Sequence, residues 1–90
     1  MKNTVAYIEE LRKKIDAIDV RLLNLFNDRA KLSQAVKKLK LVQNLPILDK
    51  EREAQIHKMV KENNKGPLKE ADLEKLFMVL LEAMREIDVS

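Results

Sequence analysis

Several charged residues of this 90-residue chain stand where the hydrophobic pattern calls for an apolar side chain. Between Leu25 and Leu32, the helical spacing of three and four lands on Arg29. Lys40 follows eleven residues later. On an α-helix that distance is three turns plus roughly 20°, so both cations share one face about 16 Å apart. Two long basic side chains on one face are suited to holding a small anion between them.

Charged residues also extend or flank the apolar faces elsewhere. Arg52 and Glu53 precede Ile56 by four and three residues, Asp88 extends the apolar stripe of the third helical segment, and Arg12 flanks the stripe of the first. Buried charge is costly without a partner, so inward-directed Arg, Lys and Glu imply mutual pairing or a ligand of opposite charge. Several cations with one or two carboxylates fit a small dianion that carries a hydroxyl.

Each of these charges also has a purely structural interpretation. Arg29 would then pair with Glu53 or Asp49, because a charge in a helical seam often fixes only the register. Lys40 would compensate the dipole at a helix C-terminus. Arg52 and Glu53 would form a solvated first turn, and Asp88 would belong to a fraying end. The pattern alone leaves both interpretations open.

The composition excludes several classes of site. With one Gly, no Cys and one His, the chain has no Gly-rich phosphate loop, no thiolate nucleophile and no Cys-based zinc site, and we expect no metal. It has neither a signal peptide nor an apolar stretch near the ~20 residues of a membrane span, so we expect a cytoplasmic protein without membrane contact. Ten of its 18 Lys and Arg lie in residues 1–45. This bias suits an anionic partner.

The candidate residues depend first on one very long helix. No Pro or Gly interrupts residues 4–41, which predicts a rod of roughly 57 Å with Thr4 as its N-cap. The helix must break at Asn44-Leu45-Pro46, because the residue before a proline avoids the helical region. Its apolar stripe comprises Val5, Ile8, Leu11, Ile15, Ile18, Leu22, Leu25, Leu32, Val36 and Leu39.

Two shorter helices complete the expected fold. Asp49 is the predicted N-cap of a second helix that runs to about Asn63. After the turn at residues 63–67, a third helix with a broad apolar face reaches almost to Ser90. Together these helices, roughly 22 and 30 Å long, just cover the first. A single all-α domain over residues 1–90 is therefore predicted to form an intertwined helical homodimer through its long helix.

The charged positions and their surroundings resemble those of the all-helical, AroQ-type chorismate mutases. The resemblance covers about residues 5–88. It is most specific in the first half, where charged positions agree at fixed spacing across two helices. The segments that carry it are Leu11–Asp19, Leu22–Arg29, Val36–Lys40 and Pro46–Glu53.

The resemblance implies an isomerase of the shikimate pathway, which serves aromatic amino acid biosynthesis. It would convert chorismate to prephenate by a Claisen rearrangement in an intertwined dimer, without cofactor, metal or covalent intermediate. Arg29 would bind one substrate carboxylate and Arg12 of the partner subunit the other, while Lys40 would hydrogen-bond the ether oxygen. Glu53 would hold the ring hydroxyl, with Asp49 nearby and Arg52 adding positive potential.

Other functions stay open at this point. Isochorismate-pyruvate lyases resemble these mutases and share the cationic pocket. A basic helical interaction module or nucleic-acid binder is disfavoured, because the cations surround the first helix and the chain has only one Tyr and two Phe for stacking on bases. The sequence also leaves open an association with, or fusion to, another enzyme of the aromatic pathway.

The third helix departs from the family pattern at two positions. Where many relatives have a serine and, one turn later, a glutamine or glutamate, this chain has Met84 and Asp88. The glutamine would donate a hydrogen bond to the ether oxygen, whereas an ionised Asp88 would repel it. Loss of the serine removes one expected contact to a substrate carboxylate.

Because a carboxyl group gains its proton as the pH falls, we predict that mutase activity rises below neutral pH. Asp88→Gln is expected to flatten this profile, since the amide donates at every pH. Initial rates of chorismate consumption across the pH range provide the measurement. A flat profile in the unmutated protein would contradict a role for Asp88.

Overall fold

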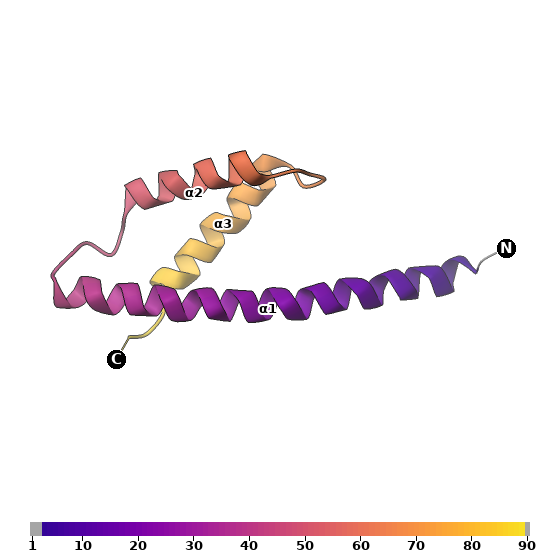
Figure 1. Ribbon diagram of the computed structural model, residues 1–90, viewed down its shortest axis with the longest axis horizontal. Coiled ribbons are helices and arrows are strands. Elements are labelled where there is room, and N and C mark those ends of the chain that lie inside the picture. The colour runs from indigo at the N-terminus through magenta and orange to yellow at the C-terminus, as the bar shows by residue number, and fades with distance from the viewer. Residues whose placement is uncertain (1–2, 90) are drawn as a thin grey trace. The chain divides into compact units, whose positions relative to one another are not determined.

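The computed structural model describes residues 3–89, which form three α-helices joined by short connections (Figure 1). The helices are α1 (Thr4–Val42), α2 (Lys50–Asn63) and α3 (Glu70–Arg85). The predicted all-α class with a long first helix is confirmed. The chain divides into two compact units, Met1–Lys31 and Leu32–Ser90, and α1 contributes to both.

Asn3 caps the start of α1 in the first unit. Its Oδ1 accepts hydrogen bonds from the backbone N–H groups of Val5, at 3.0 Å, and Ala6, at 3.5 Å. The prediction of Thr4 as N-cap was therefore wrong by one residue, since Thr4 is already helical. Asparagine ranks above threonine as an N-cap, which agrees with this arrangement.

The apolar stripe of the first unit lies on the surface. Between Val5 and Leu25 its members are 40% to 68% exposed. An exposed apolar surface of this extent marks an interaction site in a soluble protein. A lone helix has no second element against which to bury such a face. The exposed members of the stripe in this unit are Val5, Ile8, Leu11, Ile15, Ile18, Leu22 and Leu25.

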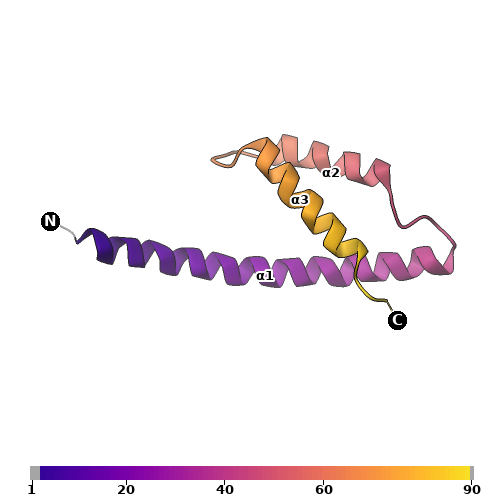
Figure 2. The same cartoon turned by 180° about the vertical axis from the view of Figure 1, so that it is seen from behind.

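In the second unit, α2 and α3 form a helical hairpin that contains the small core (Figures 1 and 2). Ile56 and Val60 of α2 and Met84 of α3 are buried, with 3%, 4% and 9% of their surface exposed. The spacing of four residues between Ile56 and Val60 places both on one face of α2. This face is the one that the sequence pattern predicted to be apolar.

Local capping sets the end of α1 and the start of α2. Asn44 adopts a φ of 55°, a left-handed conformation that asparagine tolerates, and Leu45 N–H bonds the Lys40 carbonyl at 2.8 Å. The helix thus ends at the predicted break, shortly before Pro46. Asp49 caps α2 as predicted, since its Oδ1 accepts from the Arg52 N–H at 2.9 Å.

The third helix ends earlier than the sequence predicted. It stops at Arg85, so Asp88 lies in the tail beyond α3, and Ser90 is outside the described residues. Beyond this point, side chains of α1 donate hydrogen bonds to backbone carbonyls that a further helical turn would otherwise have satisfied. Lys37 Nζ donates to the carbonyls of Arg85 and Ile87, the latter at 2.8 Å, and Gln34 Nε2 donates to the Asp88 carbonyl at 2.8 Å.

We predict that Lys37→Met lowers the free energy of unfolding by about 1–2 kcal/mol, because two partly buried carbonyls at the C-terminus of α3 lose their cationic donor. The matched control is Lys38→Met at the adjacent exposed position, which is expected to change stability by less than about 0.5 kcal/mol. Urea unfolding at equal protein concentration measures both. Equal effects of the two substitutions would contradict the assigned role of Lys37.

Candidate functional site

The connection between α1 and α2 brings Lys40 close to Asp49. Lys40 lies in the last turn of α1 and Asp49 is the N-cap of α2, and the Lys40 Nζ to Asp49 Oδ2 distance is 3.9 Å. The Lys40 side chain is only 22% exposed, whereas that of Asp49 is 45% exposed. A cation that is partly withdrawn from water interacts more strongly with an anion placed against it. The structure therefore brings two of the predicted site residues together.

One turn beyond Asp49, Glu53 forms an ion pair with α3. Its Oε1 lies 3.2 Å from Nη1 of Arg85, and the two side chains are 32% and 37% exposed. Glu53 is thus half-buried, and its charge has a partner on another helix. The pairing of Arg29 with Glu53 or Asp49, the structural alternative of the sequence, stays a prediction.

Arg85 is a site residue that the sequence analysis missed. It follows Leu81 by four residues and therefore continues the apolar face of α3 with a charge. The same signal drew attention to Arg52 and Glu53 on α2. That criterion could have identified Arg85, but it could not have identified the pairing of Arg85 with Glu53, which lies 32 residues earlier.

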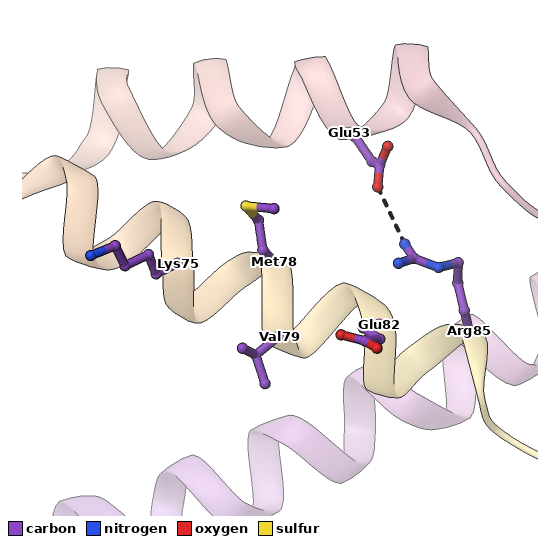
Figure 3. Close-up of a pocket in the computed structure, with 6 residues that line it drawn as sticks. All are labelled: Glu53, Lys75, Met78, Val79, Glu82 and Arg85. Carbon is purple, nitrogen blue, oxygen red and sulfur yellow. Dashed lines mark hydrogen bonds and ion pairs between the residues drawn. The ribbon is translucent and has the colours of Figure 1, made fainter.

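An open pocket of ≈ 340 Å³ lies beside this ion pair (Figure 3). Arg85 points toward Glu53 on α2, and Met78 and Val79 contribute apolar side chains to the lining. Both apolar side chains are well exposed, at 58% and 67%. The lining combines cations, carboxylates and apolar surface, and comprises Glu53, Lys75, Met78, Val79, Glu82 and Arg85.

Arg52 and Asp88 differ from the other predicted site residues of this unit. Arg52 is exposed, and its guanidinium donates to Gln55 Oε1 at 3.1 Å, a contact within α2. Asp88 is also exposed, and its backbone is held through the bond from Gln34. The prediction that Asp88 continues the stripe of a helix was wrong, because α3 has already ended at Arg85.

Arg12 and Arg29 belong to the first unit. Arg12 is 68% exposed and pairs with Glu9, three residues earlier, at 3.2 Å. An exposed pair of this kind contributes little to stability, so its arginine can exchange Glu9 for another carboxylate at small cost. Arg29 is less exposed, in the intermediate range.

Residues 3–89 show neither a metal-binding cluster nor a membrane-spanning helix. No group of three or more His, Asp or Glu side chains there is arranged to hold a metal ion. No helix of that range has both the length and the apolarity of a membrane span.

Comparison with protein families and curated relatives gives consistent matches. The family described as "Chorismate mutase type II" matches residues 11–89. The chorismate mutase of Methanocaldococcus jannaschii is 38% identical over 79 residues, which cover 83% of this chain and 77% of that protein. The bifunctional chorismate mutase/prephenate dehydratase of Aquifex aeolicus is 45% identical over 58 residues, 64% of this chain. The match spans only 16% of that relative.

The backbone also matches solved structures. The chorismate mutase of Thermus thermophilus in form II superimposes with a TM-score of 0.88 at 28% identity, over 90% of this chain and 92% of that one. Form I of the same mutase gives a TM-score of 0.83 at 29% identity, over 87% and 98%.

Proposed function

Because the chain belongs to the chorismate mutase type II family, we propose that it rearranges chorismate to prephenate. The observation that supports the activity most directly is the cluster at the start of α2, where Lys40 meets Asp49 and Glu53 follows one turn later. These are residue types that the rearrangement uses, and they lie at the junction of α1 and α2.

The rearrangement is unimolecular and depends on holding the substrate and stabilising charge. The flexible substrate must adopt a compact chair-like pose, which removes part of the entropic barrier. Negative charge develops on the ether oxygen as its bond to carbon breaks. Lys40 donates a hydrogen bond to that oxygen, and its limited exposure of 22% strengthens this interaction in the transition state. Asp49, 3.9 Å away, orients the ammonium group.

Other side chains bind the remaining polar groups of the substrate. Arg29 takes one carboxylate and Arg12 of the partner subunit takes the second, since guanidinium forks bind carboxylates through two parallel hydrogen bonds. Glu53 accepts the ring hydroxyl. Arg52, which is exposed, adds positive potential that attracts the dianion.

The site is completed in a homodimer of the 90-residue domain. The exposed apolar stripe of α1 supports this part of the proposal, because pairing with a second copy buries it along its length. Arg12 lies next to Leu11 on the edge of that stripe. It is therefore well placed to cross the interface.

The curated relatives favour a physical link to a second enzyme. The chain spans less than a quarter of the three bifunctional relatives, which pair a chorismate mutase with a prephenate dehydratase. By its name, the second activity acts on prephenate. We therefore propose that this chain works next to an enzyme that consumes its product.

The first test is chorismate consumption by the unmutated protein beside Arg29→Ala and Lys40→Ala. Each variant is expected to lower kcat/KM by about 10²-fold or more, because a charged contact to the substrate or transition state is lost. Lys38→Ala, an exposed lysine on the same helix, is the control and is expected to stay within twofold of the unmutated protein, that is, within about 0.4 kcal/mol. The proposed activity fails if the unmutated protein shows no turnover above background and binds no transition-state analogue. Pyruvate release from isochorismate in place of prephenate formation would indicate the lyase.

The second test mixes two inactive variants, Arg12→Ala and Lys40→Ala. If each site takes Lys40 from one subunit and Arg12 from the other, half of the sites in a mixed dimer are complete. An equimolar mixture that has exchanged subunits then recovers about a quarter of the unmutated activity. If Arg12 serves the site of its own subunit, no mixed site is complete and the mixture stays inactive. Sedimentation equilibrium establishes that the mixed species is a dimer.

A further inference from the structure

Arg85 links all three helices within the second unit. Its backbone carbonyl accepts a hydrogen bond from Lys37 Nζ of α1. Its side chain points to Glu53 of α2, with 3.2 Å between Nη1 and Oε1 (Figure 3). The residue is thus fixed at its backbone by one helix while its guanidinium contacts another.

Lys37 fixes the turn from which Arg85 extends. The same ammonium group also donates to the Ile87 carbonyl at 2.8 Å, so it binds the chain on both sides of Glu86. Carbonyls at a helix C-terminus have no partner within the helix, and a cation there is favoured by the helix dipole. This clamp restricts where the Arg85 side chain begins and hence which carboxylate it can reach.

The contact with Arg85 restricts the orientation of Glu53. A partly exposed glutamate otherwise samples several rotamers, and ordering them costs entropy at the moment a ligand binds. A charge-assisted hydrogen bond to one carboxylate oxygen favours a single orientation before binding. A carboxylate has about four acceptor positions, so pairing with Arg85 is compatible with a hydroxyl donor on the same group.

We propose that Arg85 is a positioning residue, which holds the Glu53 carboxylate in the orientation that receives the ring hydroxyl of the substrate. This inference rests on the proposed mutase function. Arg85 itself does not touch the reacting atoms. Its contribution enters through substrate binding, because the hydroxyl is held equally in the ground state and the transition state.

The predicted kinetic result is a rise in KM. Arg85→Met keeps an unbranched apolar stem but removes the charge and the donors, and it is expected to raise KM about fivefold while kcat changes less than twofold. Arg85→Lys retains a cation that can reach Glu53, and it is expected to recover most of the lost affinity. Lys58→Met removes an ion pair within α2, to Glu62, and is the matched control with unchanged kinetics.

A double-mutant cycle with Glu53→Gln separates positioning from a structural role. If Arg85 acts through Glu53, Arg85→Met has little further effect on KM once Glu53 is replaced. The proposal is overturned if the double variant raises KM by the product of the two single effects. It is also overturned if Arg85→Met leaves KM unchanged. If Arg85→Met does not fold, Arg85→Gln takes its place in the same cycle. Absence of turnover by the unmutated protein would overturn the proposed mutase function. The KM values of the variants test the role of Arg85 only when that turnover is present, so the two failures are distinguishable.

Discussion

The apolar surface of α1 is the constraint on which the rest of this structure depends. The described residues bury only Ile56, Val60 and Met84, while the stripe of the first unit stays 40% to 68% exposed. Burial of apolar surface is the main favourable term in folding, so such a stripe needs a cover from elsewhere. A second copy offers an identical stripe of the same length. The proposed homodimer therefore rests on the same apolar pattern that predicts the long helix.

The proposed interface between subunits would also explain how a short chain surrounds the proposed substrate. A single copy would have to bind two carboxylates, an ether oxygen and a hydroxyl with side chains from three helices. In the proposed dimer, pairing of two long helices would bring cations of one subunit beside the other. Arg12, which is the exposed partner of Glu9 in this structure, would then bind the substrate. The proposed ligand would then stabilise the charges that interrupt the apolar pattern and offset part of the cost of desolvating them.

Local interactions account for what the sequence could predict. Helix spacing, the Asp49 cap and the break near Pro46 depend on residues within a few positions of each other, and all three were recovered. The end of α3 depends instead on Lys37, 48 residues before Arg85, so no local signal revealed it. The Glu53 partner was missed for the same reason. Lys40 and Asp49 were each named as site residues from the sequence, but their contact with each other was not predicted.

Polar contacts between residues far apart in the sequence thus orient the side chains of the proposed site. A reaction that needs only substrate positioning and charge stabilisation depends on the orientation of a few side chains. A core of three buried residues packs the helices together, whereas a partly exposed side chain at a helix end is ordered only where a polar partner holds it. The bonds from Lys37 and Gln34 to the tail of α3, and from Arg85 to Glu53, act at those ends. They also anchor the backbone of the tail at Asp88, three residues beyond the end of α3.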